Sequence, residues 1–259
     1  MIQSFLLGLQ FMHWHKLDRR MMTMKKRVAL SWSGGKDGCL GLDVLTKNGI
    51  DVVCLVTTVP IELGRTFGHG EKLELVRLQG ECLDIPVEFI STTFEKYTDS
   101  FINKLAILKE KYQLDGIAFG DLYLQGHREW GEKMAESAGL EAIYPLWGKQ
   151  EDALNMLENY LQSGYKATVI RIREDILDET WLGRQLDYSF FEDVKTKQMC
   201  PMGESGEYHS FVYDGPLFKQ KIILKNPEII QLETTKKLEF SQYELQTKDH
   251  SHTEAGDSF

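Results

Sequence analysis

The sequence contains few cysteines and no long apolar run. The chain has 259 residues and only four cysteines, at positions 39, 54, 82 and 200, with no C-x-x-C pair. This spacing excludes a disulfide framework and the usual zinc-binding patterns, and it is typical of a reducing compartment, so we expect a cytoplasmic protein. No segment approaches the ~18 apolar residues that a membrane span requires. We therefore expect no membrane partner.

The chain also lacks an excess of positive charge. It has 30 Lys and Arg against 39 Asp and Glu, a formal net charge of −9. Sequence-independent binding to nucleic acid needs a basic field, so nucleic acid is not an expected partner, although a local basic patch stays open. Hydrophobic residues make up 42% of the chain, enough for the core of one large domain or two small ones.

The two ends of the chain differ from the rest. Residues 5–12 are apolar and precede a group of positive charges, whereas a signal peptide has its positive charges first. Three methionines follow, the last of them Met24. We expect that translation starts at Met24 or that residues 1–26 form an extension. Residues 248–259 are polar and aperiodic, which predicts a disordered tail.

Strand and helix patterns alternate in the first part of the chain. The predicted strands are 27–32, 52–58, 86–90, 116–119 and 142–143, and the predicted helices are 38–48, 71–83, 94–113 and 124–138. Such alternation predicts an α/β domain over residues 27–148, a Rossmann-like parallel sheet with helices on both faces. Ligands of these sheets bind at the carboxyl ends of the strands, which here carry the loop after the first strand, Thr57-Thr58, Gly120-Asp121 and Pro145-Leu146.

The alternation ends near residue 148. A helical pattern over 151–163 and a strand over 166–172 are followed by an irregular segment, and residues 219–246 are typical of short antiparallel strands. The sequence therefore predicts a second, smaller α+β domain over residues 149–247.

The most informative local feature is the loop Ser33-Gly34-Gly35-Lys36-Asp37-Gly38, between the first strand and the first helix. Adjacent glycines let the backbone approach a ligand closely, and the free amides of the helix N-terminus favour phosphate. Lys36 adds a cation, and Asp37 can cap the helix or hold a metal ion. An ordinary glycine-rich turn capped by Asp37 is the alternative.

The loop resembles the SGGxD[ST] pyrophosphate loop of the N-type ATP pyrophosphatases. The P-loop pattern does not fit, because Leu30 stands where its first glycine is needed and Asp37 where its hydroxyl residue belongs. The resemblance implies that ATP is cleaved between its α- and β-phosphates. Gly38 departs from the pattern, since the family has Ser or Thr there.

A second informative stretch runs from Gly203 to Phe218. Glu204 and Glu207 stand three residues apart among small residues, so both carboxylates can reach one cleft. There they can bind an ammonium group, bind Mg²⁺ or act as a base. A solvated acidic turn is the alternative interpretation.

This stretch resembles the GE-G-GE-[FY]-E-T-F-x-x-D-x-P-L-F signature of the diphthine–ammonia ligase family. Further motifs of that family occur in the same order, and the resemblance covers residues 27–225: Gly120-Asp121, Arg128 and Trp130; Pro145-Leu146-Trp147 with Glu151-Asp152; and Leu182-Gly183 with Leu186-Asp187. It implies a nucleotide domain of the adenine nucleotide alpha hydrolase type and a smaller α+β domain. It also implies an ATP-dependent ligase that amidates diphthine on an elongation factor with ammonia, through an acyl-adenylate, releasing AMP and pyrophosphate.

The resemblance implies a set of site residues as well. The expected catalytic residues are Lys36, Asp37, Glu204 and Glu207, and Asp37 is the expected ligand of Mg²⁺. ATP is expected to contact Ser33, Gly34, Gly35, Lys36, Asp37, Gly38, Thr57, Gly120 and Asp121. The other substrates, ammonium and a carboxylate acceptor, are expected to contact His69, Arg128, Glu204 and Glu207.

Two departures keep other functions open. Gly38 lacks a hydroxyl, and His209 stands in place of the family's third acidic residue, which changes the charge where a cationic acceptor would bind. One alternative is an RNA-modifying ATP pyrophosphatase, against which the missing C-x-x-C pair and the acidic balance count. Another is a nucleotide-binding module without turnover. Whether the chain forms a homodimer is left open.

Overall fold

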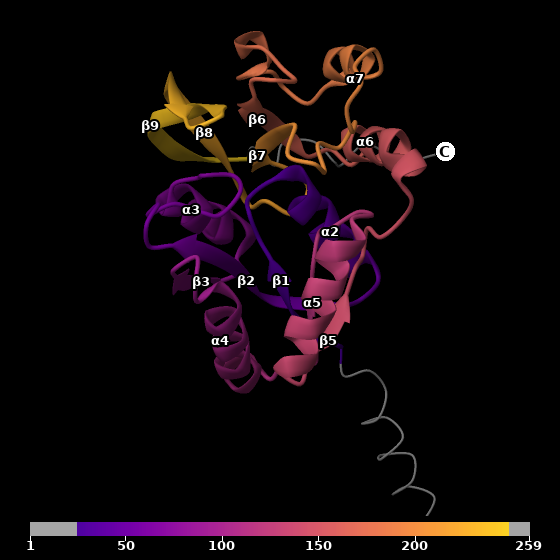
Figure 1. The fold of residues 1–259 in the computed structure, drawn as a ribbon, viewed down its shortest axis with the longest axis vertical. Coiled ribbons are helices and arrows are strands. Elements are labelled where there is room, and N and C mark those ends of the chain that lie inside the picture. The colour runs from indigo at the N-terminus through magenta and orange to yellow at the C-terminus, as the bar shows by residue number, and fades with distance from the viewer. Residues whose placement is uncertain (1–24, 249–259) are drawn as a thin grey trace, which may run out of the picture.

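The structure is a computed structural model that describes residues 25–248 (Figure 1). Nearly all of the predicted extension, up to residue 24, and of the predicted tail, from residue 249, lies outside the described residues. None of the helices between residues 25 and 248 combines the length and the apolar character that crossing a bilayer requires.

The first half of the chain forms a five-stranded parallel sheet with the strand order β3-β2-β1-β4-β5. Its strands are β1 (Arg27–Ser31), β2 (Asp51–Pro60), β3 (Val87–Thr92), β4 (Gly116–Ala118) and β5 (Glu141–Ile143). The helices that connect them are α2 (Lys36–Lys47), α3 (Leu73–Leu83), α4 (Tyr97–Tyr112) and α5 (Gln125–Ser137).

Helices cover both faces of this sheet, because side chains alternate along each strand. Val28 and Leu30 of β1 face a core that contains α2 and α3, while Ala29 faces a core that contains α4 and α5. The predicted α/β class with a Rossmann-like parallel sheet is confirmed. The predicted bounds of these elements agree with the structure to within a few residues.

The second half of the chain forms a smaller antiparallel sheet, with the order β7-β6-β9-β8. In Figure 1 it lies above the parallel sheet, and its core is continuous with the α2–α3 side of that sheet. Its elements are η1 (Gln150–Asp152), α6 (Ala153–Gln162), β6 (Lys166–Arg173), η2 (Glu179–Trp181), α7 (Tyr188–Val194), β7 (Tyr208–Asp214), β8 (Gln220–Leu232) and β9 (Thr235–Thr247).

Two features of this second half differ from the sequence prediction. Residues 219–246 do not form short strands, but a hairpin of two strands with 13 residues each. Pro227 does not end β8, because Asn226 takes a positive φ of 51° and the pairing skips this residue. The segment predicted to be irregular contains α7, whose N-terminus is capped by Asp187, with its side chain accepting a hydrogen bond from Phe190 N.

Candidate active site

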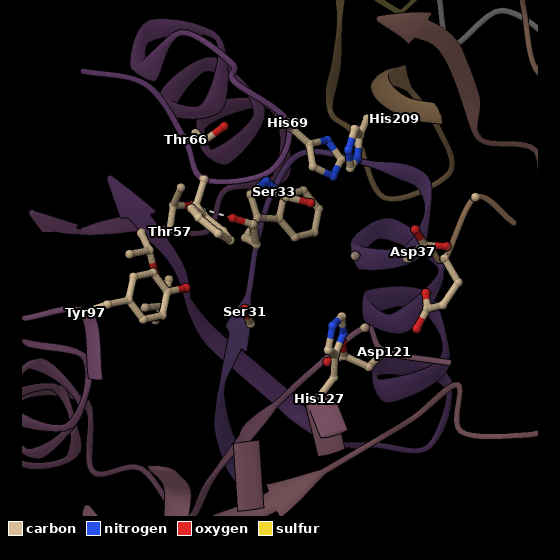
Figure 2. A pocket seen from close by; sticks show the side chains of 18 residues that line it. Ser31, Ser33, Asp37, Thr57, Thr66, His69, Tyr97, Asp121, His127 and His209 are labelled. Atoms are coloured by element: carbon tan, nitrogen blue, oxygen red, sulfur yellow. Dashed lines mark hydrogen bonds and ion pairs between the residues drawn. The ribbon is translucent and has the colours of Figure 1, made fainter. Parts of the chain in front are cut away.

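The candidate site lies where the strand order of the parallel sheet reverses, between β1 and β4. In open α/β sheets, ligands bind outside the carboxyl ends of the strands at this point. A cavity of about 250 Å³, here called the main cavity, opens there (Figure 2). Its lining comes from both sheets: Ser31, Trp32, Ser33, Asp37, Gly38, Val56, Thr57, Thr58, Thr66, Phe67, His69, Tyr97, Gly120, Asp121, His127, Gly203, Glu204 and His209.

The glycine-rich loop is held in place by the second sheet. Gly34 has a φ of 82°, which favours glycine, and a Cβ atom there would lie 2.5 Å from Gln79 Oε1. The carbonyl of Gly34 accepts hydrogen bonds from Val212 N and from Gln79 Nε2, both at 2.9 Å. The buried Gln79 side chain also donates to Val212 O at 2.7 Å. These hydrogen bonds from α3 and β7 hold the backbone of the loop at Gly34.

The first turn of α2 takes its cap from a remote residue. Gly35 at the N-cap position has no side chain to offer, and Lys36 N instead donates to Ser210 Oγ of β7, at 3.1 Å. The amides of Asp37 and Gly38 belong to the same first turn, where no helical carbonyl is in reach. These two amides, with the positive end of the helix dipole behind them, can receive an anion in the main cavity.

Lys36 and Asp37 form an ion pair beneath this turn. Lys36 is 2% exposed, its Nζ lies 3.0 Å from Asp37 Oδ2, and the same ammonium lies 4.8 Å from the centre of the Tyr208 ring. Burial raises the pKa of the Asp37 carboxyl, against the opposing effect of Lys36. Asp37 Oδ1 is shut off from solvent and has no hydrogen-bond partner among the described residues. This oxygen is therefore a buried acceptor whose hydrogen-bonding capacity is not satisfied.

Glu204 enters the main cavity from the loop before β7. Its Oε1 accepts a hydrogen bond from Leu122 N at 3.0 Å, which fixes the carboxylate close to the end of β4. Burial, together with the negative charges of Asp37 and Asp121, raises the pKa of Glu204 to about 7. A carboxylate with this pKa can accept a proton at neutral pH and release it again.

Glu207 has a different environment from Glu204. It is 5% exposed, and its two carboxylate oxygens accept hydrogen bonds from Cys200 N at 3.0 Å and from Ser205 N at 2.9 Å. It is not among the residues that line the main cavity. This placement favours a role in shaping the loop that carries Glu204 over the catalytic role that the sequence predicts.

Two histidines form the opposite wall of the main cavity. The rings of His69 and His209 lie 4.5 Å apart, and a Cβ atom on Gly35 would contact His69 (Figure 2). Burial lowers the pKa of His209 to about 3, and Arg171 and Lys36 add to the effect. Burial, His209 and Lys36 also hold the pKa of His69 well below its usual value. Both rings are therefore neutral at pH 7.

A second hollow of about 480 Å³, here called the aromatic cavity, adjoins the main cavity. Five residues line both hollows: Ser31, Phe67, Tyr97, Asp121 and His127. The aromatic cavity adds the rings of Phe94, Phe119 and Trp130. Aromatic walls of this kind suit a planar ring system such as a nucleobase.

The structure brings most of the predicted residues together, but not all. The predicted residues that line the main cavity are Ser33, Asp37, Gly38, Thr57, His69, Gly120, Asp121 and Glu204. The lining does not include Gly34, Gly35, Lys36, Glu207, Pro145 or Leu146. The first three lie between the lining residues Ser33 and Asp37, and Glu207 accepts a hydrogen bond from the loop that carries Glu204. Arg128 lies outside the lining: its guanidinium lies 4.9 Å from the Trp147 ring, and its Nε donates to Glu132 Oε1 at 2.7 Å.

Sequence reasoning missed His127, Tyr97 and Ser31. His127 Nδ1 lies 2.9 Å from Asp121 Oδ1, which raises the pKa of His127. Its position near the start of the helix that follows Gly120-Asp121 was a usable signal, because that end of the helix faces the strand ends. Tyr97 had no such signal, because the sequence around it does not show whether its side chain lines a cavity or lies on an exposed helix surface.

Known proteins match this chain over both halves. Residues 25–142 match the family model "Diphthamide synthase N-terminal domain", and residues 152–245 match "Diphthamide synthase C-terminal domain". Together the two models cover most of the chain, with the N-terminal model first and the C-terminal model second. The chain belongs to the diphthamide synthase family.

Curated relatives carry one common name. The diphthine–ammonia ligases of Bos taurus and Homo sapiens are 27% and 28% identical to this chain, over 79% of the chain and 85% of each relative. The diphthine–ammonia ligase of Schizosaccharomyces pombe is 26% identical over 77% of the chain and 36% of its own length. The predicted family and the predicted enzyme class, a ligase, are confirmed.

Proposed function

We propose that this chain is an ATP-dependent diphthine–ammonia ligase that works through an acyl-adenylate. The observation that carries the proposal is the main cavity itself. A glycine-rich loop and a helix N-terminus, which suit phosphate, face a carboxylate with a raised pKa, which suits proton transfer. The names of the relatives supply the expected acceptor, diphthine, and the expected amine, ammonia. The resemblance in sequence implies that the diphthine is carried by an elongation factor.

The two adjoining cavities support one pose for ATP. The phosphates fit at Ser33 and at the amides of Asp37 and Gly38, with the Lys36 ammonium beneath them. The adenine ring fits the aromatic cavity, which shares five lining residues with the main cavity. This pose places the α-phosphate near the boundary of the two cavities, where Asp121 and His127 also lie.

The chain offers Mg²⁺ a suitable ligand in Asp37. Mg²⁺ prefers carboxylate oxygens and phosphates, and Asp37 Oδ1 is an oxygen in the phosphate region with no partner among the described residues. When bound, the ion would neutralise charge on the phosphate oxygens. Lys36 holds the other oxygen of Asp37 at 3.0 Å, which fixes the direction in which Oδ1 points.

The proposed reaction has two steps. A carboxylate oxygen of the acceptor attacks the α-phosphorus, the bond to the bridging oxygen breaks, and pyrophosphate leaves. Ammonia then attacks the acyl carbon of the mixed anhydride, and AMP leaves as the amide forms. Glu204 accepts the proton that the attacking nitrogen loses, because its pKa of about 7 leaves much of it ionised at neutral pH.

Glu207 is proposed as a positioning residue. Its two hydrogen bonds to Cys200 N and Ser205 N hold the loop that presents Glu204. His209 is neutral at pH 7, so it adds no charge that would repel a cationic acceptor. The four free, buried cysteines agree with a reducing compartment, and we propose the cytoplasm.

Phosphorus NMR tests the proposal. The full chain is incubated with ATP, Mg²⁺, ammonium and an elongation factor that carries diphthine. The proposal predicts AMP and pyrophosphate in step with amide formation, and no ATP cleavage when the acceptor is omitted. Without ammonium, it predicts pyrophosphate from the first step alone and no amide. ADP and orthophosphate as products, or an acceptor that stays unmodified, would overturn it.

A further inference from the structure

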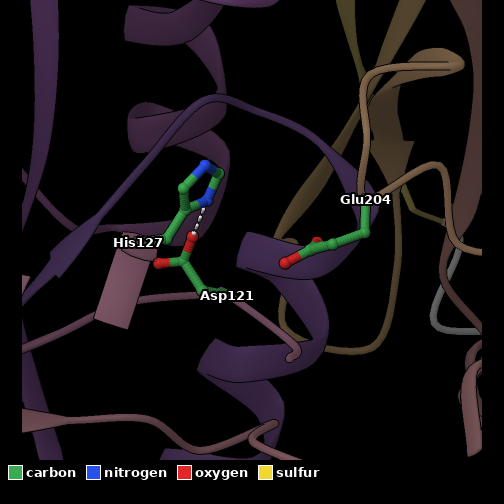
Figure 3. Close-up of side chains that lie close together, drawn as sticks. All are labelled: Asp121, His127 and Glu204. Carbon is green, nitrogen blue, oxygen red and sulfur yellow. Dashed lines mark hydrogen bonds and ion pairs between the residues drawn. The ribbon is translucent and has the colours of Figure 1, made fainter. Parts of the chain in front are cut away.

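Three potential metal ligands from two distant segments of the chain meet at one edge of the main cavity. Asp121 follows β4, His127 lies in the first turn of α5, and Glu204 lies in the loop before β7. One ligand atom of each lies within 4.8 Å of the others. Figure 3 shows the Glu204 carboxylate extending from the opposite side of the site toward Asp121 and His127.

The local charge also favours a cation at this position. Asp37, Asp121 and Glu204 bring three carboxylates to the same cavity. The Lys36 ammonium, whose charge acts on Glu204, is already paired with Asp37 Oδ2 at 3.0 Å. Asp37 Oδ1, which is buried and has no partner among the described residues, adds a further unsatisfied acceptor beside these carboxylates. Carboxylates gathered in this way repel one another unless a positive ion lies among them.

We propose that Asp121, His127 and Glu204 form a binding site for a divalent transition-metal ion, of which Mn²⁺ is the representative. An imidazole nitrogen distinguishes this set from the oxygen-only environment that Mg²⁺ prefers. Carboxylates and a histidine together suit Mn²⁺, Fe²⁺ and Zn²⁺. The site is distinct from the proposed Mg²⁺ position, whose protein ligand is Asp37.

The geometry fits such an ion at two of the three ligands. His127 Nδ1 and Asp121 Oδ1 are 2.9 Å apart, close to the edge of roughly 3 Å that an octahedron has when its ligands lie about 2.1 Å from the ion. Metal binding replaces the proton that these two atoms share, so this proton is released. Glu204, whose ligand atom lies within 4.8 Å of the other two and whose carboxylate is held by Leu122 N, completes the set through a bound water. The proton-accepting role proposed for Glu204 applies to the chain without this ion.

The test uses the full chain and MnCl₂ alone, without nucleotide. Calorimetry measures affinity and stoichiometry, and pulsed EPR detects coupling of the Mn²⁺ electron spin to a histidine nitrogen. His127→Ala and Asp121→Asn remove single ligands. The matched control is Glu129→Gln, which removes an exposed carboxylate from the same helix as His127.

The proposal predicts one Mn²⁺ per chain that shows nitrogen coupling and is not displaced by an equal concentration of Mg²⁺. His127→Ala should abolish the coupling, and both ligand variants should weaken binding by about tenfold or more. Glu129→Gln should behave as the unchanged chain. Equal affinity and equal nitrogen coupling in the unchanged chain and in His127→Ala would overturn the site. Because no ATP is present, that result would leave the ligase proposal standing.

Discussion

The two sheets contribute to the site in different ways. The parallel sheet supplies a continuous segment, Ser33 to Gly38, whose role follows from its position between β1 and α2. The antiparallel sheet supplies single side chains from the segment that leads into β7 and from β7 itself, namely Glu204, His209 and Ser210. The first contribution is local in sequence, and the second exists only after the two sheets have docked.

This difference explains why the glycine-rich loop depends on contacts with the second sheet. The carbonyl of Gly34 and the amide of Lys36 both have their partners in β7, 174 or more residues further along the chain. Gln79 of α3 joins the same junction with hydrogen bonds to both sides. A substitution that breaks these hydrogen bonds would disturb the contributions of both sheets at once. The role of one sheet can therefore be tested only with substitutions that leave this junction intact.

The largest expected effect is at Glu204. Glu204→Gln keeps the shape of the side chain but removes the base, so acceptor-dependent AMP formation should fall by about 10²-fold or more, while ATP affinity changes little. Rapid-quench kinetics and calorimetry measure the two quantities. Glu151→Gln, an exposed carboxylate of the second half, is the matched control. If Glu204→Gln loses ATP affinity instead of turnover, the glutamate serves the nucleotide or its metal ion.

The next effect concerns the junction. Gln79→Ala removes a buried side chain that donates to Gly34 O and Val212 O and accepts from Trp32 Nε1. Leaving buried polar groups without partners should lower the free energy of unfolding by about 2 kcal/mol. Urea denaturation measures this change, with Gln125→Ala on the exposed start of α5 as control. Equal losses in the two variants would contradict a junction that depends on Gln79.

A somewhat smaller effect is expected in the glycine-rich loop. Lys36→Ala combined with Asp37→Ala should weaken ATP binding at least tenfold, about 1.4 kcal/mol. Calorimetry with ATP and Mg²⁺ measures it, and the exposed ion pair Lys149–Glu151, replaced in the same way, is the control. Unchanged affinity in the Lys36 and Asp37 double variant would rule this loop out as the phosphate site.

The smallest expected effect is on the pH profile. The pKa of Glu204 is raised to about 7, and a base acts only when it is deprotonated, so turnover should be present above pH 7 and lost as the pH falls. AMP formation at saturating ammonia should rise by about tenfold between pH 6 and pH 8. Glu204→Gln should lack this step. An identical profile in both proteins would assign the titration to another group.

The sequence predicted the parallel sheet well, because each βα unit carries its own pattern of apolar residues and glycines. It also predicted the approach of Thr57 and Gly120-Asp121 to the loop, because the carboxyl ends of parallel strands share one edge of the sheet. The resemblance in sequence singled out Glu204, whose place in the main cavity agrees with a role at the site.

The remaining features depend on contacts that no local pattern shows. Ser210 replaces the missing cap of α2 only through docking, and Glu207 differs from Glu204 because two backbone amides happen to enclose it. The His69–His209 pair joins two sheets, so neither residue alone indicates it. The length of the β8–β9 hairpin was missed because no local pattern over residues 219–246 shows how far the two strands pair.

The central claim is that both sheets form one site in which a carboxylate attacks the α-phosphate of ATP. Its most direct test is an oxygen-transfer experiment with an acceptor whose carboxylate carries heavy oxygen (¹⁸O). The account predicts that the AMP released with the amide contains one ¹⁸O atom, because the attacking carboxylate oxygen stays on the α-phosphorus. Amide formation in which the ¹⁸O is absent from AMP and appears in orthophosphate would contradict the account.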